Sequence, residues 1–267
     1  STVNFLSDDG KWTLRAFQKE NPSHELGCTS QFGTIYGDRF YIVSKQEKDP
    51  SATVIGSRLA VIDAKTMKVL KEFTRIGDSD GRSFLGVDEH TGYIGTSNGI
   101  FLYDIDKMEI GERITGTENT SGSLYSAQIG TMIRVGDRVF AVHQKDGLLV
   151  IDAKTHTLET TILKPEEHEG HGLGSIVLSK DGTIWASPTV ELTGTGASLP
   201  LIWKVDPTTL TVQQVDIPTA SGIEEIPNSW YAWTADGFCA STKENKIYWK
   251  GQGTGSWFTG YKIFCYD

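Results

Sequence analysis

The sequence predicts an all-β protein, a β-propeller made of four-stranded antiparallel blades. The segment VIDAKT occurs twice, at 61–66 and 150–155, and each copy lies inside a longer pattern that returns along the chain. The pattern returns at intervals of about 40 to 60 residues, which is typical of propeller blades. A second kind of hairpin precedes each return, and no segment carries a sustained helical period. These three observations favour a propeller over a mixed α/β fold.

The repeated pattern has the sequence of a β-hairpin. An apolar or β-branched run is followed by an Asp, a short polar turn and an alternating strand. Less similar copies are IFLYDIDKMEIGERI, LIWKVDPTTLTVQQVDI, the N-terminal VNFLSDDGKWTLRAF and the shortened YKIFCYD. Because a carboxylate at the start of a turn accepts main-chain N–H groups two residues on, we predict a turn-capping role for the recurring Asp8, Asp63, Asp104, Asp152, Asp206 and Asp267.

Another hairpin lies upstream of each copy of the pattern except the N-terminal one. It is seen in FGTIYGDRFYIVSK, FLGVDEHTGYIGTS, GTMIRVGDRVFAVHQ, GSIVLSKDGTIWAS and FCASTKENKIYWK. The turns of these hairpins are rich in Gly, Asp and Asn, which tolerate a positive φ. The upstream hairpin therefore supplies strands A and B of a blade, and the VIDAKT-type hairpin supplies strands C and D.

The predicted domain is a single β-propeller over 1–267, with residues 1–20 forming strands C and D of the closing blade. Complete blades are expected at 29–73, 83–114, 129–163 and 174–217, and a partial blade at 238–267. Because the two ends do not match, we favour a larger ring whose last blade is completed by the N-terminal pair. The alternative is a closed five-bladed propeller in which KWTLRAFQ is the missing strand D, with VNFLSDD and KIFCYD competing for one place.

Composition narrows the classes of partner. The formal net charge is −9 and the basic residues are scattered, so a nucleic-acid backbone would be repelled. No apolar stretch is long enough to span a bilayer, and the N-terminus lacks the features of a signal peptide. Either the protein is cytoplasmic or an export signal lies upstream. The three cysteines have no metal-like spacing and predict no disulfide framework.

Ligand binding is expected on the face formed by the loops before strand A and between strands B and C, because these loops vary in length while the opposite turns are short. The segments just before strand A are CTSQ, DGRS, YSAQ, GHG and PNSWYAW, and one long loop between strands B and C is GQGTGSWFTGY. They combine hydrogen-bonding groups with flat aromatic surface. The candidate ligand-binding residues are Gln31, Arg82, Ser83, Gln128, His171, Asn228, Trp230, Tyr231 and Trp257.

The chemical motifs of the sequence predict no metal or cofactor. HEGH at 168–171 lacks the spacing of a zinc helix, and its third ligand is missing. DSDGRS begins like a calcium loop, but Arg82 and Ser83 occupy the positions of a ligand oxygen and of the turn glycine. No nucleophile elbow or phosphate loop is present, so no catalytic residue is assigned.

Four long segments resemble a known family: RAFQKENPSHELGCTSQFGTIYGDRFYIVSKQ, GRSFLGVDEHTGYIGTSNGI, GDRVFAVHQKDGLLVIDAKT and IPNSWYAWTADGFCASTKENKIYWKG. They are similar to the DUF5074 group of YncE-like surface-layer propellers from Bacteroides-type bacteria. The resemblance implies seven blades and an exported lipoprotein at the outer-membrane surface or in the periplasm, whose lipid anchor is absent from this sequence. The group includes a vitamin B12-capturing surface lipoprotein that works beside an outer-membrane transporter.

Three functions follow as hypotheses. The first is a non-enzymatic surface protein that holds a bulky small nutrient, with a corrinoid such as cobalamin implied by the resemblance and an outer-membrane transporter as partner. The second is a propeller hydrolase or lyase acting on a glycan, which would use His171 or His143 with Arg82 and a carboxylate. The third is a protein-interaction scaffold, which would expose an apolar patch on the loop face.

Overall fold

The computed structural model describes residues 1–121, 127–168, 170–191, 199–218, 227, 238–251 and 261–267. Within these residues, antiparallel strands form four four-stranded sheets, one three-stranded sheet and one two-stranded hairpin. The predicted all-β fold with four-stranded propeller blades is thereby confirmed. None of the described helices is long and apolar enough to cross a membrane. The chain divides into two compact parts, Ser1–Arg113 and Ile114–Asp267, and each is described by itself.

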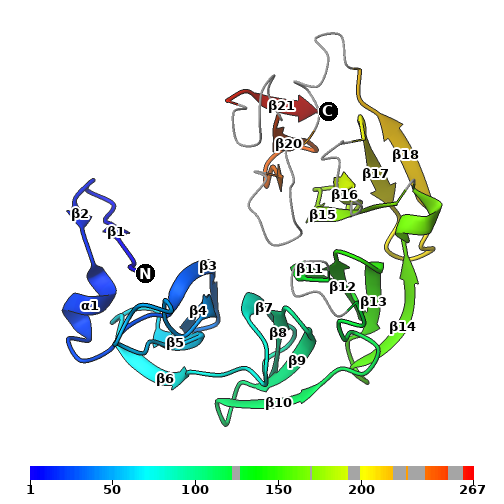
Figure 1. Ribbon diagram of the computed structural model, residues 1–267. Helices are drawn as coiled ribbons and strands as arrows, with labels where there is room; N and C mark the ends of the chain where they lie inside the picture. Colours follow the sequence, from blue (N-terminus) through cyan, green and yellow to red (C-terminus); the bar gives the residue numbers. More distant parts are fainter. Residues whose placement is uncertain (122–126, 169, 192–198, 219–226, 228–237, 252–260) are drawn as a thin grey trace. The chain divides into compact units, whose positions relative to one another are not determined.

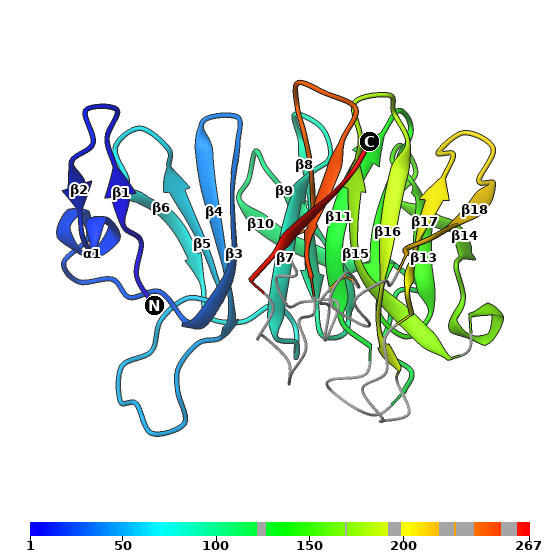
Figure 2. The same ribbon diagram turned by 90° about the horizontal axis from the view of Figure 1, so that it is seen from above.

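The first part holds two complete blades and the N-terminal hairpin (Figures 1 and 2). Strand β7 packs against β3 and β4, so the two blades share one core. The N-terminal hairpin is β1 (Phe5–Leu6) with β2 (Trp12–Thr13), and the blades are β3 (Cys28–Tyr36), β4 (Arg39–Gln46), β5 (Leu59–Asp63) and β6 (Val69–Phe73), followed by β7 (Gly81–Gly86), β8 (Thr91–Thr96), β9 (Gly99–Asp104) and β10 (Glu109–Arg113).

One short helix corrects the prediction for the N-terminal segment. Residues Ala16–Glu20 form helix α1, where we expected the end of strand D, and β2 is only two residues long. Arg15 adopts a left-handed conformation with φ 55°, which turns the chain out of the hairpin. Phe17 is fully buried and packs against Ile42 and Ile62 of the neighbouring sheet. Burial of this one ring explains why the segment turns inward instead of extending.

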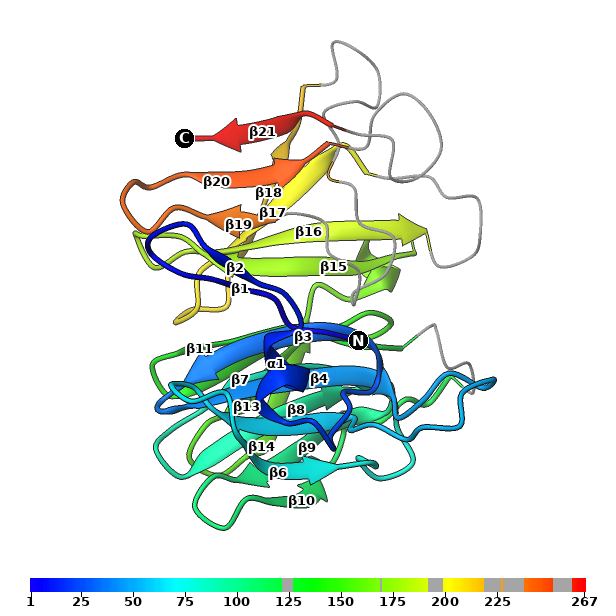
Figure 3. The same ribbon diagram turned by 90° about the vertical axis from the view of Figure 1, so that its left-hand side faces the viewer.

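The second part holds two further complete blades and a three-stranded sheet (Figure 3). Its strands are β11 (Ile129–Val135), β12 (Arg138–His143), β13 (Gly147–Asp152) and β14 (Thr157–Ile162), then β15 (His171–Leu178), β16 (Ile184–Glu191), β17 (Leu201–Val205) and β18 (Val212–Asp216), and finally β19 (Cys239–Ala240), β20 (Ile247–Lys250) and β21 (Ile263–Tyr266). A 3-10 turn, η1 (Pro165–Glu167), precedes β15.

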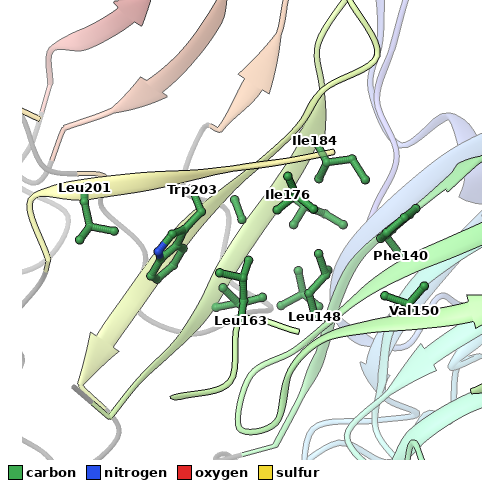
Figure 4. Close-up of a cluster of buried hydrophobic side chains, with 12 residues drawn as sticks. Phe140, Leu148, Val150, Leu163, Ile176, Ile184, Leu201 and Trp203 are labelled. Atoms are coloured by element: carbon green, nitrogen blue, oxygen red, sulfur yellow. The ribbon is translucent and has the colours of Figure 1, made fainter. Parts of the chain in front are cut away.

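The core between the two complete blades of this part is apolar and tightly closed (Figure 4). Phe140 and Leu148 come from one blade, and Ile176, Ile184 and Trp203 come from the other. All five are nearly or fully buried. The inner strands can pack on both sides because their apolar residues are consecutive, as in residues 139–142 and 148–151, which makes both faces of the sheet apolar.

Cys239 and Cys265 lie on the two outer strands of the three-stranded sheet. Both are opposite Tyr248 of the central strand β20. This is the arrangement expected from the sequence, and both cysteines are free. Strands separated by one intervening strand are about 9 to 10 Å apart, so the two backbones are too distant for a disulfide bond.

The recurring Asp caps the turn between strands C and D in all four complete blades. Asp63 Oδ1 accepts the main-chain N–H of Thr66 at 2.7 Å, and Asp152 Oδ1 accepts that of Thr155 at 2.7 Å. These hydrogen bonds lower the pKa of both carboxyl groups. Asp104 and Asp206 accept equivalent bonds. In the N-terminal hairpin the side chain that accepts the main-chain N–H is that of Ser7 instead of Asp8, because Ser7 comes directly after the strand.

In each of the four complete blades, the turn between strands C and D also contains a non-glycine residue in the left-handed region, four positions after the capping Asp. The φ angles there lie between 53° and 60°, and the residues are Met67, Met108, His156 and Leu210. A turn followed by a left-handed residue is a common hairpin connection. The Asp and the left-handed position together fix the register of strands C and D, which explains why the pattern recurs while the rest of the sequence diverges.

Two arginines join neighbouring blades at these turns. Arg39, the first residue of β4, donates a hydrogen bond to the main-chain oxygen of Ile105 in the next blade. Arg138, the first residue of β12, donates to the main-chain oxygens of Pro207 at 3.1 Å and Thr208 at 2.9 Å. Both arginines follow a Gly-Asp turn, and both reach the residues just after the capping Asp of the next blade. The same inter-blade contact therefore occurs once in each part of the chain.

We expect Arg138→Met to lower the free energy of unfolding by about 2 kcal/mol. The substitution removes a partly buried and an exposed hydrogen bond from a charged donor, together with an ion pair to Glu159, while the aliphatic stem is kept. Urea unfolding followed by circular dichroism measures the change. Lys154→Met is the matched control, because it removes only an ion pair with Asp137 between exposed side chains, and the unfolding midpoint should stay unchanged. An equal effect of the two substitutions would show that Arg138 does not join the blades.

Candidate functional site

The first strand of every complete blade is interrupted by a β-bulge near its first residues. We call the end of a sheet where its first strand begins the leading end, and the opposite end the turn end. The pairing shifts between Ser30 and Phe32 in β3 and between Gly81 and Ser83 in β7. Similar shifts occur at the start of β11 and β15. Bulges aim a side chain away from the regular alternation and are frequent beside functional sites.

In the first part, the two bulges bring two predicted site residues together. The extra residues are Gln31 in β3 and Arg82 in β7, and Arg82 Nη1 lies 3.2 Å from Gln31 Oε1. The same nitrogen donates to the oxygen of Gly81 at 3.0 Å, and Nη2 lies 3.3 Å from Asp80 Oδ2. The Arg82 side chain is 0% exposed and that of Asp80 is 14% exposed. Asp80 therefore neutralises a guanidinium that has been removed from water.

Other polar side chains surround this group at the leading end. Ser30 Oγ and Ser44 Oγ are 2.8 Å apart, across strands β3 and β4. The main-chain N–H of Asp80 donates to Ser97 Oγ at 2.9 Å. Ser83, also predicted, is buried on β7. The leading end of these two blades is thus built from hydroxyl and amide groups around one neutralised charge.

The long connection from β4 to β5 is anchored at the same end. Arg58 Nη2 lies 2.7 Å from Glu47 Oε2, and its Nε donates to the same oxygen at 2.9 Å. The main-chain N–H of Glu47 and the Arg58 guanidinium lower the pKa of the Glu47 carboxyl. Between these two anchors, Val54 and Ile55 are exposed. The loop is therefore fixed at its base and carries an exposed apolar pair on its returning arm, just before Gly56, whose N–H is bonded to the oxygen of Glu47.

In the second part, the predicted Gln128 and His171 are both buried at the leading ends of their blades. The main-chain oxygen of Gln128 accepts the N–H of Gln144 at 3.0 Å. One ring nitrogen of His171, Nδ1, lies 3.0 Å from the main-chain oxygen of Thr189, which requires that this nitrogen be the donor. His171 is thus held against β16 at the start of β15.

His143 has a structural role at the end of β12. It is fully buried, and its Nδ1 accepts the main-chain N–H of Asp146 at 3.0 Å, which closes the tight turn into β13. Burial lowers the pKa of His143, and the carboxylate of Asp146, 3.6 Å away, offsets part of this effect. The neutral ring is therefore the form that fits the folded protein, because a protonated Nδ1 could no longer accept this N–H.

This arrangement predicts a loss of stability in weak acid. The unfolded chain takes up a proton on His143 near the ordinary pKa of 6.5, whereas the folded protein resists until its lower pKa is reached. The contribution of His143 is complete above pH 6.5 and declines as the pH falls below that value. His143→Gln should make the urea midpoint less dependent on pH between about 6.5 and 5. Unchanged pH dependence in the variant would contradict this role.

The remaining predicted site residues, Asn228, Trp230, Tyr231 and Trp257, lie outside the residues that the structure describes. The sequence interpretation missed Asp80 as the partner of Arg82, although the pair is only two residues apart in the sequence. It also missed the arginine contacts at the turn end. The repeated Gly-Asp-Arg in residues 37–39 and 136–138 is the signal that could have revealed them.

Comparison with known proteins identifies the fold and a family. Residues 1–267 match the family described as "Domain of unknown function (DUF5074)", and no curated protein matches the chain. Among solved structures, the chain is similar to the extracellular domain of the putative one component system BT4673 from B. thetaiotaomicron, with 12% identity and a TM-score of 0.57 over 94% of this chain and 31% of that one.

Two further similarities to solved structures are weaker. The extracellular domain of the putative hybrid two component system BT3049 from B. thetaiotaomicron gives 12% identity and a TM-score of 0.48 over 84% of this chain and 32% of that one. The computationally designed Ika4 protein gives 10% identity and a TM-score of 0.42, over 72% of this chain and 92% of that one. At these identities the comparisons bear on the fold alone, and function has to be argued from the site.

Proposed function

Because the chain belongs to the DUF5074 family, whose description assigns no activity, we propose a function from its own site: a non-enzymatic protein that binds a bulky small nutrient at the leading ends of its blades. The contact between Gln31 and Arg82 carries this proposal. Two bulged residues from two different blades meet at 3.2 Å, and neither is needed to cap a turn or to continue a strand. Bulges are frequent beside functional sites, and binding residues often lie where connections meet a rigid scaffold.

The contrast between the two ends of the blades supports this assignment. At the turn end, the recurring Asp residues are used by their own turns, and Arg39 and Arg138 join neighbouring blades. At the leading end, the connections between strands B and C differ in length, from residues 47–58 to residues 97–98. A rigid scaffold with variable connections at one end is the usual arrangement of a binding protein.

The hydrogen bonds of His143 make this residue unsuited to act as a general base. Nδ1 of His143 accepts an N–H within its own turn, and Nδ1 of His171 is hydrogen bonded to Thr189. A general base must present its free nitrogen to the substrate. The ring proton of His143 is therefore on Nε2, so this residue has no nitrogen left to act as a base. In His171 the proton is on Nδ1 and Nε2 is unprotonated, so its hydrogen bond to Thr189 fixes the ring without excluding a basic role.

The finer part of the proposal is that the ligand is a corrinoid and that the protein is exported to the outer-membrane surface, beside a transporter. Resemblance to YncE-like surface lipoproteins supports it. The chemistry of the leading end is consistent with a large neutral ligand, because the charge of Arg82 is balanced by Asp80 and the surrounding groups are hydroxyls and amides. Of these groups, the partly exposed Ser30 and Gln31 can exchange hydrogen bonds with the amide side chains of a corrinoid.

Isothermal titration calorimetry with cyanocobalamin tests the proposal. We expect binding at micromolar concentration or tighter. Arg82→Lys should raise the Kd about tenfold, because an ammonium cannot hold Gln31, the Gly81 oxygen and Asp80 together as the buried planar guanidinium does. Gln31→Ala should weaken binding as well. Lys154→Gln at the turn end is the control and should bind as the natural protein does.

Two results would contradict the proposal in different ways. Absence of heat with cyanocobalamin at about 100 µM would eliminate the corrinoid. Binding that is equally tight in Arg82→Lys and Gln31→Ala, with both variants folded, would eliminate the leading-end site while leaving a nutrient-binding function elsewhere on the protein.

A further inference from the structure

A groove of about 470 Å³ opens on the outer side of the first part, between β6 and the hairpin formed by β9 and β10. We call it the rim groove. Its apolar lining consists of Phe73 from β6, Phe101 from β9, Met108 directly before β10, and Ile110 from β10. All four are partly exposed. Two aromatic rings left partly open to solvent in one groove form a surface suited to a flat apolar group.

The rim groove is also locally basic in an acidic protein. Lys71 and Arg75 line it, and the Lys71 ammonium lies 5.8 Å from the centre of the Phe73 ring. Among the described residues, neither cation forms a direct ion pair. Arg75 does interact with the carboxylate of Glu47 at longer range, where it adds a small part to the lowering of the Glu47 pKa by the Glu47 N–H and Arg58. Glu109 is the one carboxylate in the lining. With a net charge of −9 over the chain, two cations beside an aromatic surface mark a place where an anion is attracted.

An equivalent groove in the second part, of about 390 Å³, shows what such a place accommodates. Counted from the capping Asp of each blade, Phe101 corresponds to Trp203, and Arg75 corresponds to Lys164. In the second part the ring of His168 lies against Trp203, with 4.7 Å between the ring centres and an angle of 52°. Trp203 is consequently only 1% exposed. In the second part, the chain itself therefore places the ring of His168 against Trp203 of β17.

The first part lacks such a ring. In the second part, His168 is carried by the segment that contains η1, directly before β15. The corresponding linker of the first part, residues 74–80 with the sequence TRIGDSD, has no helical turn and no aromatic residue. Its Gly77 has a φ of 54°, and a Cβ there would lie 2.8 Å from the Phe101 ring. The linker thus contacts the edge of the Phe101 ring through Gly77, which has no side chain, and Phe101 stays partly exposed in the groove.

We propose that the rim groove binds a planar aromatic carboxylate, whose ring packs on Phe101 and Phe73 and whose carboxylate is held by Lys71 and Arg75. The ring takes the place that His168 fills in the equivalent groove. Arg75 can bind a carboxylate through two parallel hydrogen bonds, and Lys71 adds a second positive charge. Arg75 belongs to the linker that ends at Asp80, but the site uses neither Gln31 nor Arg82, so different substitutions test the two proposals.

Methionine-methyl NMR tests this proposal directly. The chain has three methionines. Met108 lines the rim groove, whereas Met67 packs against the sheet that contains Ile62, and Met132 lies on β11 of the second part. Titration of the methyl-labelled protein with 2-naphthoate should give a saturable ring-current shift of Met108 alone. The neutral analogue 2-naphthylmethanol should bind at least fivefold more weakly, because it lacks the charge.

Matched variants distinguish ring from charge. The double variant Lys71→Gln, Arg75→Gln should raise the Kd for 2-naphthoate at least tenfold, and Phe101→Leu, which keeps an apolar side chain, should raise it at least fivefold. Lys164→Gln in the equivalent groove is the control and should leave the Kd unchanged. Methyl spectra of the free variants confirm that each one is folded.

Three results would overturn the proposal. The first is no shift of Met108 at about 10 mM 2-naphthoate. The second is equal affinity for the neutral alcohol, which would show that Lys71 and Arg75 do not select an anion. The third is an unchanged Kd in the double variant and in Phe101→Leu, which would place the bound naphthoate elsewhere.

Discussion

Replacing Gly172 by alanine should lower the free energy of unfolding by about 3 kcal/mol. Gly172 is the second residue of β15, where this strand approaches the end of the preceding blade. An added Cβ would lie 2.0 Å from the main-chain oxygen of Gln144. That oxygen belongs to the backbone and cannot rotate away as a flexible side chain could, so the two blades would have to separate locally.

The first part offers both a parallel case and a control for this prediction. Gly81 opens β7 in the same way, and a Cβ there would lie 2.5 Å from the oxygen of Ser44, so Gly81→Ala should be comparably destabilising. At Gly111, on the exposed strand β10, a Cβ would lie 3.3 Å from Leu102 Cβ and 3.5 Å from the Leu102 main-chain oxygen, which is close to ordinary contact, and the change should stay within about 0.5 kcal/mol. Urea unfolding measures all three variants. A loss below about 1 kcal/mol for Gly172→Ala would refute the close approach of the blades.

Trp203→Ala should cost about 4 kcal/mol, because it empties a large volume in the core between two blades. Trp203 packs with Leu148 and Ile176 (Figure 4), and it also carries the ring contact with His168. Thermal and urea unfolding measure the loss. Trp12→Ala is the control, because that ring is 63% exposed on β2, and its removal should change stability by less than about 0.5 kcal/mol.

A second substitution separates packing from hydrogen bonding at this position. Within the described residues, the buried Nε1 of Trp203 has no hydrogen-bond partner. Trp203→Phe keeps much of the apolar volume and removes that N–H, so it should cost clearly less than Trp203→Ala. Equal destabilisation by the two substitutions would mean that the indole N–H of Trp203 contributes to stability beyond the packing of the ring.

The fold was predictable because its signals are local. The Asp of VIDAKT accepts N–H groups from its own turn, as seen at Asp63 and Asp152, so each hairpin is encoded within about a dozen residues. Repetition of that local unit predicts the blades. Helix α1 was missed because its cause is distant in sequence: Phe17 is buried against residues of β4 and β5, and five residues are too few to show a helical period.

The contacts between blades could not be predicted from the sequence for the same reason. Gln31 and Arg82 could be assigned to one face from their positions before or early in strand A. Their 3.2 Å contact depends on two bulges, and a bulge changes the register without a signature in these residues. The contact from Arg138 to Pro207 crosses 69 residues. Alternation of apolar and polar residues describes a strand, but it does not specify which neighbour a long side chain will reach.

The measurement that tests the proposed binding function most directly is hydrogen–deuterium exchange of the protein with and without saturating cyanocobalamin. The leading-end site predicts slower exchange in residues 30–32 and 80–83, where the bulges present Gln31 and Arg82. The capped turns at 63–67 and 152–156 should exchange as before, because their Asp side chains are already used. Protection confined to those turns, or none at saturation, would contradict binding at the leading end.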